Sequence, residues 1–531
     1  MYKSYGVTSI VTIILLSANV SFADIHTATS CAYGDVSAAV TAASSGDTVS
    51  VPAGSCDWGT NTIFMSKAIK INGNNTTLNG AHTAYGFFAI SNSSSESFPF
   101  DISGFNFVTT GTYIMHIAGA GYNWRIHGNS FYKSTPSGIL SFAMINAGGS
   151  HTLFGLIDNN SFTNVKIDIV GTSMSSADSS WKAAAQWGTN QAIFVENNIF
   201  RRNVGTSTAN AIDSNGGARM VIRYNTFNDA RVEAHSACET SVRGTRSYEV
   251  YNNIFNYTGS NWEPPLRLRG GSHVVTGNTV SGNWSPSSVT LDNRRSSFDS
   301  SCASGFGNSD GTSIYDTNLL NSASGRVDGY LALDQPGAGT GPIGAQTSDP
   351  IYIWGNTSGK ICLGGTNQYA SCTSNSDCPS STCSTKVTTP NNVYLHNNIN
   401  NQPYHIVSGR DYFENTARPG YTKYTCPHPL AGSGSCDSTV AGRAGYAITE
   451  PSVTVPAPNP VATYAVTVSK NGSGTVTSSP LGIDCESTCS YSFTSGTSVT
   501  LTAVADTGYS FGSWSGACTG TNATCTLTMD A

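Results

Sequence analysis

The residues that could carry acid–base chemistry are concentrated in one segment of this 531-residue sequence. Between Ala211 and Arg269, 13 of 59 residues are Asp, Glu, Lys or Arg, about twice the 11% found over the whole chain. Parts of the segment alternate apolar and polar residues, as in 232–235 (VEAH) and 266–269 (LRLR). Alternation with a period of two indicates β-strands, so we expect these charged side chains to point outward from a sheet.

Two glycine doublets predict the register between these strands. Gly216-Gly217 matches Gly270-Gly271, and strands that neighbour each other in a sheet lie about 4.8 Å apart. This match aligns residues 213–217 with residues 267–271, and Glu233 and His235 fall between the two segments. The outward side chains therefore form two columns across the strands. These are Asp213, Glu233 and Arg267 in one column and Asn215, His235 and Arg269 in the other, with Asp292 and Arg294 as candidates to extend both.

Such columns contain the groups that a polysaccharide lyase needs. The lyase reaction requires a cation to neutralise a uronate carboxylate, a base for the C5 proton and an acid for the leaving oxygen. We assign His235 or Glu233 as the base, Arg267 and Arg269 as the neutralising cations, and Asp213 as the acid partner. A glycoside hydrolase is the alternative enzyme, since Asp213 and Glu233 could meet the spacing of about 5 Å for retention or about 6.5–9.5 Å for inversion.

The same pattern is also typical of a plain ion-pair ladder, in which stacked acids and arginines only stabilise the fold. Aromatic residues beside the columns would favour sugar binding, and Trp181, Trp187 and Trp262 are near in sequence, although tryptophan is more often a packing residue. Calcium is not expected here, because arginines interrupt the carboxylates. No phosphate-binding loop, dinucleotide fingerprint, zinc-protease motif or Gly-x-Ser-x-Gly elbow occurs, so no cofactor is expected.

The elements that must position these columns are repeated strands. An Asn followed two positions later by Phe or Val recurs at intervals of 23 to 38 residues, and the flanking segments alternate. A drifting period of this length, with Asn and Gly at the corners, is typical of a parallel β-helix whose loops vary in length. We expect the asparagines to stack along the solenoid. The copies begin at Asn106, Asn129, Asn160, Asn198, Asn225, Asn253 and Asn278.

The N-terminus has the features of an exported protein. Lys3, an apolar stretch from about Val11 to Val20 and the motif Ser21-Phe22-Ala23 predict a secretory signal peptide over residues 1–23. The stretch is too short for a transmembrane anchor. Export favours disulfides over metal or redox sites for the 14 cysteines. We expect the close pairs Cys31 and Cys56, Cys426 and Cys436, Cys485 and Cys489, and Cys518 and Cys525 to be disulfides.

A second cysteine group lies in Gly-, Ser- and Asn-rich sequence at residues 362–383. It consists of Cys362, Cys372, Cys378 and Cys383. Zinc is the rival interpretation, but no histidine lies within the group, so we expect two disulfides whose connectivity the sequence leaves open. Cys238 and Cys302 are then left to pair with each other or not at all.

The opening of the exported chain resembles that of pectate-lyase-like right-handed parallel β-helices. The resemblance rests on residues 31–35 (CAYGD), a helical stretch over 36–43, and a turn and strand over 46–54. In that family the helix covers the open end of the solenoid, and the Cys31 to Cys56 pair would hold it there. Residues 409–430 resemble the closing segment of secreted bacterial β-helix proteins, which implies a structural role for His428. The resemblance implies a β-helix over residues 24–446 and specifies fold rather than activity.

The C-terminal part changes character. Residues 447–463 contain Pro451, Pro456, Pro458 and Pro460 and predict a semi-rigid linker. Residues 464–531, with segments such as 511–516 (FGSWSG), resemble the divergent B-repeat modules of internalin-like bacterial surface proteins. Such modules are small β domains that act as spacers or contacts at cell surfaces. The family pattern continues by one strand, so we expect the module to be incomplete at its C-terminus.

Composition excludes other classes of protein. With 38% hydrophobic residues the chain is not disordered, and with a net charge of −6 it lacks the basic excess of a nucleic-acid binder. No later stretch is apolar enough to span a membrane. We therefore expect a secreted or cell-surface all-β protein, a right-handed parallel β-helix with an N-terminal helical cap and a small C-terminal β module. Its expected partner is extracellular polysaccharide or a cell-surface glycan, and the sequence leaves cleavage open. The alternative is a non-catalytic surface adhesin or structural spacer.

Overall fold

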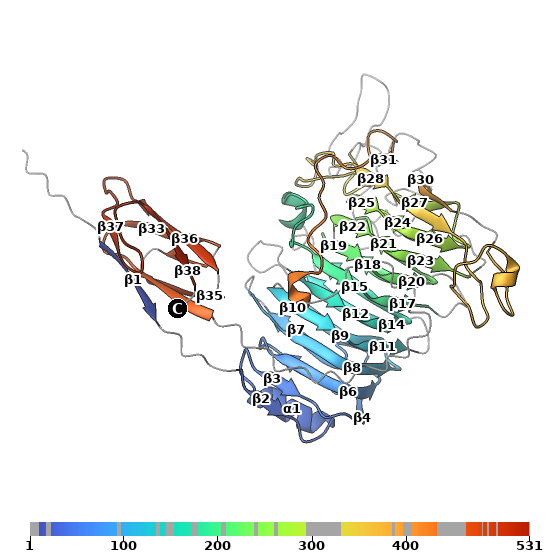
Figure 1. Ribbon diagram of the computed structural model, residues 1–531, viewed down its shortest axis with the longest axis horizontal. Coiled ribbons are helices and arrows are strands. Elements are labelled where there is room, and N and C mark those ends of the chain that lie inside the picture. The colour runs from blue at the N-terminus through green and yellow to red at the C-terminus, as the bar shows by residue number, and fades with distance from the viewer. Residues whose placement is uncertain are drawn as a thin grey trace, which may run out of the picture. The chain divides into compact units, whose positions relative to one another are not determined.

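The computed structural model shows a nearly all-β chain that divides into two compact units (Figure 1). One unit spans residues 24–447, and the other combines residues 448–531 with residues 1–23. The structure describes residues 10–16, 23–92, 97–119, 121–133, 138–144, 153–171, 179–202, 209–237, 243–259, 264–293, 331–384, 388–396, 406–432, 463–480, 482–485, 488–494 and 497–529.

The larger unit is a parallel β-helix, which confirms the predicted fold class. Its coils contribute strands to three parallel stacks, and the long strands β6 and β8 belong to both the first and the second stack. The first stack contains β2 (Ile25–Thr27), β3 (Thr48–Ser50), β6 (Lys70–Gly80), β8 (Asp101–Thr109), β10 (Gly121–His127), β13 (Leu153–Asp158), β16 (Ile193–Glu196), β19 (Arg219–Arg223), β22 (Ser247–Tyr251), β25 (Ser272–Thr276), β28 (Ile351–Trp354) and β31 (Tyr412–Glu414).

The other two stacks run beside the first (Figure 1). The second adds β4 (Ser55–Gly59), β11 (Ser130–Lys133), β14 (Ser161–Thr163), β17 (Ile199–Arg201), β20 (Thr226–Asn228), β23 (Ile254–Tyr257), β26 (Thr279–Gly282) and β29 (Thr357–Gly359) to β6 and β8. The third contains β5 (Ile63–Met65), β7 (Phe88–Asn92), β9 (Tyr113–Gly119), β12 (Gly138–Met144), β15 (Val165–Gly171), β18 (Ala209–Ser214), β21 (Ala230–Ala234), β24 (Leu266–Leu268), β27 (Ser287–Leu291) and β30 (Thr389–Leu395).

Two buried ladders run along the coils and explain the repeat. The side-chain amide of each ladder asparagine donates to the side-chain oxygen of the next, at 2.8–3.1 Å. This ladder joins Asn129, Asn160, Asn198, Asn225, Asn253, Asn278, Asn356 and Asn391. Next to it, Phe107, Phe131, Phe162, Phe200, Phe227 and Phe255 stack with ring centroids 4.6–5.2 Å apart. The predicted asparagine ladder is therefore confirmed.

Asn106 was predicted to begin this ladder, and that part of the prediction is wrong. Phe107 pairs with Phe131, so Asn106 lies opposite Ser130 and one position out of register with Asn129. Its side chain instead donates to Asn75 Oδ1 at 2.8 Å.

A short helix covers the first coils, as predicted. Helix α1 (Tyr33–Ala42) buries Val36, Ala39 and Val40, and its N-terminal side is tied by the Cys31–Cys56 disulfide. The indole of Trp58 donates to the carbonyl of Cys31 at 2.9 Å. Because the helix covers apolar ends of the first coils, it shields the core from water there.

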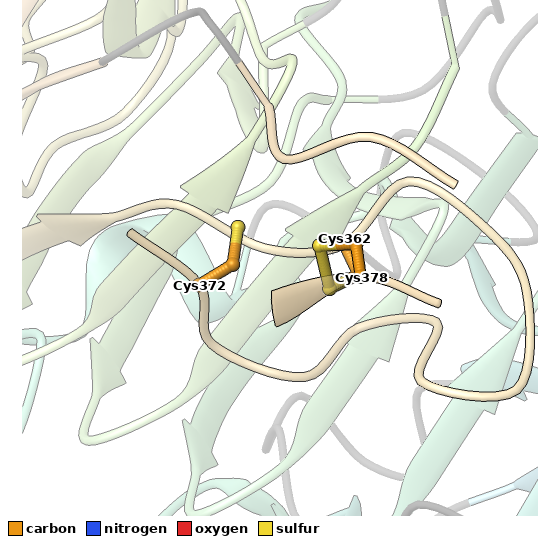
Figure 2. A group of neighbouring side chains, drawn as sticks. All are labelled: Cys362, Cys372 and Cys378. Atoms are coloured by element: carbon orange, nitrogen blue, oxygen red, sulfur yellow. A yellow bond between two sulfur atoms is a disulfide. The ribbon is translucent and has the colours of Figure 1, made fainter. Parts of the chain in front are cut away.

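The cysteine-rich insert holds two disulfides, Cys362–Cys378 and Cys372–Cys383, around the short 3-10 helix η1 (Asn375–Asp377). Figure 2 shows the first of these bonds with Cys372 beside it. All four thiols are thus oxidised, which confirms disulfides over zinc. Cys426 and Cys489 are also disulfide-bonded. Cys238, Cys302 and Cys436 lie outside the described residues.

The smaller unit contains two four-stranded sheets. One has the order β35 (Thr488–Thr494), β32 (Thr463–Ser469), β1 (Ile10–Leu16) and β37 (Ser513–Gly516). The other has the order β34 (Asp484–Cys485), β33 (Gly474–Ser479), β36 (Ser498–Ala505) and β38 (Thr524–Thr528). Strand β1 lies within the predicted signal peptide. It pairs antiparallel with β32 and parallel with β37. A disulfide joins Cys518 to Cys525.

Candidate functional site

The predicted column of Asp213, Glu233 and Arg267 lies on the outer side of the third stack. Asp168 of β15 pairs with Asp213 of β18, and Glu233 of β21 pairs with Arg267 of β24. Ile212 pairs with Val232, which places Asp213 opposite Glu233. The register predicted from the glycine doublets is therefore confirmed. It extends to Asp168, which the sequence analysis did not include.

The second column, of Asn215, His235 and Arg269, lies two residues further along each coil. The backbone N–H of His235 donates to the carbonyl of Ser214 at 2.9 Å, and that of Arg269 donates to the carbonyl of Ala234 at 2.8 Å. Leu268 pairs with Leu291, so Asp292 continues this column only. Thr290, and not an acidic residue, continues the column of Arg267. Arg294 lies outside the described residues.

Asp213 is held by three neighbours. Nε2 of His235 lies 2.7 Å from its Oδ1, and Nζ of Lys166 lies 3.2 Å from its Oδ2. The side-chain amide of Asn210 donates to the same Oδ2 at 2.9 Å. Burial alone would raise the pKa of Asp213, but His235, Lys166 and Asn210 together hold it well below its ordinary value. Asp213 is thus a carboxylate, which suits it to orient His235 and not to donate a proton.

Glu233 sits among arginines. Arg231 Nη2 lies 2.9 Å from one carboxylate oxygen, while Arg269 and Arg267 approach the other, Arg267 at 3.8 Å. Burial opposes ionisation, yet Arg269 and Arg231 outweigh it and lower the pKa of Glu233. A carboxylate stabilised in this way is a weak base, so of the two bases proposed from the sequence the geometry favours His235.

The far end of the cluster contains another acid. Arg267 donates to Oδ2 of Asp292 at 3.0 Å, and Nδ1 of His396 lies 3.6 Å from the same oxygen.

At the opposite end of the cluster, next to Asp213, Nζ of Lys166 also lies 3.2 Å from Oδ2 of Asp168. Burial raises the pKa of Asp168, although Lys166 opposes this effect. The sequence analysis missed Lys166 and Asp168, and the alternation of polar and apolar residues in 166–168 (KID) is the signal that could have revealed them.

The members of the cluster differ in exposure. The side chain of Lys166 is 25% exposed and that of Arg267 15%, whereas those of Glu233 and Asp292 are 2% and 1% exposed. His235 is 17% exposed. Asp168 and Asp213 are 18% and 10% exposed, so of the four acids Glu233 and Asp292 lie beneath the N–H donors of Lys166, His235 and Arg267.

Polar groups without a protein partner border this cluster. Nε and Nη1 of Arg202, Oγ1 of Thr290 and Oγ of Ser236 are buried and make no hydrogen bond to the described part of the chain. Burial lowers the pKa of Arg202 to about 10. Buried donors of this kind cost free energy unless a water or a ligand meets them.

The tryptophans suggested from the sequence are packing residues where the structure describes them. Trp181 is fully buried, and its indole N–H donates to the carbonyl of Gly244 at 2.9 Å. The guanidinium of Arg243 lies 4.7 Å from its ring centroid. Arg418 covers Trp187 at 4.4 Å. Trp262 lies outside the described residues.

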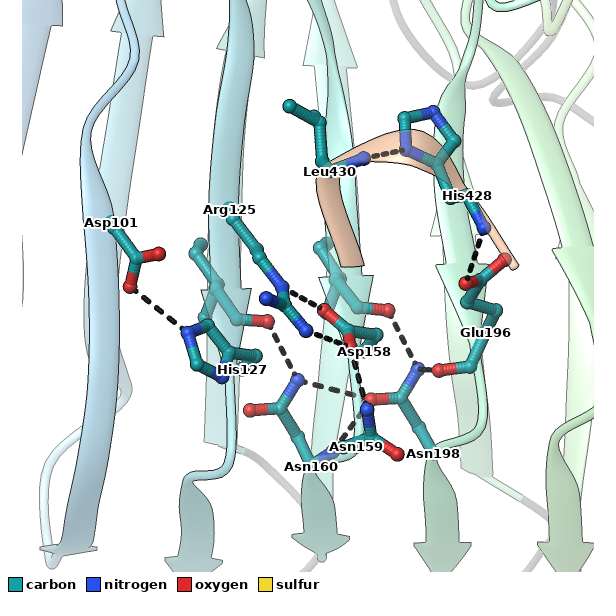
Figure 3. Close-up of polar contacts among 12 residues, drawn as sticks. Asp101, Arg125, His127, Asp158, Asn159, Asn160, Glu196, Asn198, His428 and Leu430 are labelled. Atoms are coloured by element: carbon teal, nitrogen blue, oxygen red, sulfur yellow. Dashed lines mark hydrogen bonds and ion pairs between the residues drawn. The ribbon is translucent and has the colours of Figure 1, made fainter. Parts of the chain in front are cut away.

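A second charged ladder follows the outer side of the first stack, and the closing segment covers part of it (Figure 3). Arg125 donates to both carboxylate oxygens of Asp158 at 2.8 and 2.7 Å. The backbone N–H of His428, which precedes the 3-10 helix η3 (Pro429–Ala431), donates to Glu196 at 3.3 Å. Burial lowers the pKa of His428 to about 4, and its Nδ1 accepts from the Leu430 N–H. These contacts agree with the structural role expected for His428.

Comparisons with known proteins give a family match for the C-terminal part of the chain and a distant structural neighbour. Residues 464–531 match the family model of the divergent InlB B-repeat domain, which confirms the resemblance seen in the sequence. No curated protein matches the chain. Among solved structures, a point mutant of the PL6 family alginate lyase AlyGC is similar, with a TM-score of 0.28 and 14% identity over 50% of this chain. The chain spans 40% of that structure.

Proposed function

We propose that the outer side of β15, β18, β21 and β24 binds an acidic polysaccharide. The observation that carries this proposal is the partial exposure of Lys166, His235 and Arg267, at 25%, 17% and 15%, in rows where the carboxylates of Glu233 and Asp292 are nearly buried. N–H donors arranged in rows at the strand spacing suit the repeated carboxylates of a uronate chain.

For cleavage, the arrangement suits β-elimination. His235 would take the C5 proton, the C–H electron pair would form the C4–C5 double bond, and the C4–O bond would break. The imidazolium formed at His235 would return the proton to the leaving oxygen, so atoms and charge balance. Arg267 would neutralise the uronate carboxylate, whereas Arg269 is 3% exposed and pairs with Glu233. Asp213 would hold the imidazole in position through its 2.7 Å contact.

Export belongs to the same proposal. The disulfides Cys31–Cys56, Cys362–Cys378, Cys372–Cys383 and Cys518–Cys525 favour an oxidising compartment. Among the described residues, no helix has the length and apolar character needed to cross a bilayer. The predicted signal peptide of residues 1–23 would direct the chain to the cell surface or the medium.

Affinity electrophoresis and calorimetry on alginate, polygalacturonate and a neutral glucan test the binding. We expect the wild type to bind the acidic polymers, with affinity falling as salt rises. Lys166→Gln and Arg267→Gln should each weaken this binding, while the exposed Lys70→Gln on the first stack serves as the matched control. Equal binding of all three variants would overturn the proposed face.

Absorbance of the unsaturated product tests cleavage. His235→Ala should abolish product formation and should weaken polymer binding no more than Lys166→Gln or Arg267→Gln does. Absence of product with every uronate polymer, together with intact binding, would favour the second candidate function.

That second candidate is a non-catalytic surface adhesin. Its support is the mutual pairing of the cluster, where four acids, Asp168, Asp213, Glu233 and Asp292, face Lys166, Arg231, Arg267 and Arg269. The B-repeat match at residues 464–531 is also in keeping with it.

A further inference from the structure

A pocket lies on the same outer side of the third stack, at the coils nearest α1. It has a volume of about 320 Å³. Phe64 and Tyr85 form its rim and are 70% and 49% exposed, although both are large aromatic residues. His116 closes one side, and Ser66 and Ser91 add hydroxyl groups. Among the residues that the structure describes, those lining this pocket carry no charged side chain.

The three rings form one surface. The centroids of Phe64 and Tyr85 are 5.6 Å apart, and those of Tyr85 and His116 are also 5.6 Å apart, both with edge-to-face geometry. Burial lowers the pKa of His116, so its imidazole is neutral near pH 7. Aromatic faces with hydroxyl and imidazole groups at their margin suit a ligand that has an apolar face and a polar edge.

The pocket is in register with the charged cluster. Phe64 pairs with Ala89, Ala89 pairs with His116, and His116 pairs with Ser141. Ser141 pairs with Asp168, which pairs with Asp213. His116 and Asp213 are therefore three strand spacings apart along one column, or about 14 Å. A single extended chain lying across the strands would contact both places.

The backbone holds Tyr85 in an unfavourable conformation that presents its ring. Tyr85 has φ 64°, in the left-handed region that costs a residue with a Cβ about 1–2 kcal/mol. The next residue, Gly86, has φ 79°, and a Cβ there would lie 2.1 Å from the carbonyl carbon of Ile114. Because the backbone of Gly86 packs directly against the backbone of Ile114, the turn at Tyr85 and Gly86 is held in one conformation. An exposed aromatic side chain kept in such a turn points to a function for that side chain.

We propose that the Phe64, Tyr85 and His116 pocket binds a pyranose ring of the same acidic polysaccharide chain that the charged cluster binds, as a remote subsite. This inference rests on the proposed function for its acidic partner. The C–H face of the sugar packs on Phe64 and Tyr85, and its hydroxyls meet His116 and the serines. The pocket thereby sets the minimum chain length for tight binding and fixes the direction in which the chain crosses the strands.

Oligosaccharides of defined length test the subsite in the full-length protein. The probes are oligogalacturonates and alginate oligomers, each as a trisaccharide and as a decasaccharide, with cellohexaose as the neutral probe. The variants are Phe64→Ser and Tyr85→Gly. Tyr132→Ser is the matched control, because Tyr132 is 42% exposed but lies on β11 of the second stack.

We expect each pocket variant to weaken decasaccharide binding by about threefold to tenfold and to leave trisaccharide binding unchanged. The loss should persist at high salt, since contact with aromatic rings is not screened. Tyr132→Ser should bind as the wild type does. Tyr85→Gly suits its φ of 64°, so its folding is favoured and its loss of binding reports the ring.

The outcomes separate the two proposals. If acidic chains bind and the pocket variants bind them equally well, the subsite is overturned and the proposed function stands. If acidic chains fail to bind but cellohexaose binding is lost in Tyr85→Gly, the pocket takes sugar and the acidic-chain proposal falls. If no glycan binds, both are overturned. A change of oligomeric state in Tyr85→Gly would instead make this face an interface between copies, which also overturns the subsite.

Discussion

Asp213 and His235 form the closest acid–imidazole contact of the charged cluster, with 2.7 Å between Oδ1 and Nε2. Asp213 lies in β18 and His235 directly follows the neighbouring strand β21, so the two belong to neighbouring columns. Lys166 and Asn210 hold the carboxylate of Asp213 in place, and this carboxylate orients the imidazole ring of His235. Asp213 therefore acts as a positioning residue if His235 is the base.

Asp213→Asn tests that relationship. We expect product formation to fall by about 10²-fold or more, because the imidazole loses the group that orients it. The loss should appear in kcat and leave KM nearly unchanged, since Asp213 does not face solvent. Asp213→Glu should recover part of the activity. A parallel rise in KM with unchanged kcat would contradict the positioning role.

Glu233→Gln should destabilise the protein by about 3–5 kcal/mol near pH 7. The change removes the carboxylate that Arg231 and Arg269 contact and leaves Arg269, which is 3% exposed, without that negative partner. Urea unfolding with the wild type in parallel measures the difference.

The pH dependence of that difference has a defined sign. The pKa of Glu233 is lowered in the folded protein, so its contribution is complete above the ordinary value of 4.5 and is lost as pH falls through the folded value. The gap between wild type and Glu233→Gln should therefore shrink in acid. A gap that is constant down to pH 2 would contradict the electrostatic explanation.

His273 should make the β-helix sensitive to acid. It is fully buried and neutral, with Nδ1 accepting from the Tyr248 N–H at 3.1 Å and Nε2–H donating to the Gly270 carbonyl at 2.6 Å. Burial lowers its pKa from 6.5 to about 3. The unfolded chain thus binds a proton that the folded chain refuses, and stability falls as pH drops from about 6.5 toward 3.

The loss attributable to His273 is of order 4 kcal/mol across that window. His273→Asn should have lower stability at neutral pH but a flatter profile between pH 6.5 and 3, measured by urea unfolding at each pH. Parallel profiles for the two proteins would show that other groups cause the acid sensitivity.

Asn225→Ala should destabilise the solenoid by about 3 kcal/mol or more. The side chain of Asn225 accepts from the backbone and side chain of Asn198, each at 3.0 Å, and donates to the Val195 carbonyl at 2.8 Å. Removing it leaves these buried groups unpaired. Asn106→Ala is the matched control, because Asn106 lies outside the ladder, and it should cost less than about 1 kcal/mol. Chemical denaturation of both variants gives the comparison.

These ladders explain why the fold was predictable. Asparagine and phenylalanine recur because each coil must satisfy the same buried backbone groups and fill the same core position, so the pattern is visible in the sequence. Asn106 shows the limit of that argument. A copy displaced by one residue looks the same in sequence, yet its side chain leaves the core.

The candidate site was predictable only in part. Gly216-Gly217 and Gly270-Gly271 aligned Asp213 with Arg267 correctly, with Glu233 on the strand between them. Lys166 and His396 were missed because long insertions separate them from the charged segment, and only the completed coils bring them together. The pocket of Phe64, Tyr85 and His116 has no motif, since it arises from exposed positions on three separate turns of the chain.

The buried ion pair of Glu196 and Arg223 contacts the closing segment, residues 409–430, and variants of this pair test how that segment is held. Arg223 Nη2 lies 2.6 Å from Glu196, and both side chains are fully buried. Arg223 also donates to the Tyr424 carbonyl at 2.9 Å, and Glu196 accepts from the His428 N–H. Glu196→Gln leaves the arginine buried without its carboxylate, so we expect a loss of about 3–5 kcal/mol and faster proteolysis within residues 418–432.

The double variant Glu196→Gln/Arg223→Met distinguishes an unpaired charge from a lost contact. Replacing both partners removes the buried cation together with its carboxylate, so most of the stability should return. The closing segment should stay sensitive to protease, because Tyr424 and His428 no longer have their charged partners. Full recovery of protease resistance would show that apolar packing of Tyr424 and Leu430 on Phe194 and its neighbours is sufficient to hold the segment.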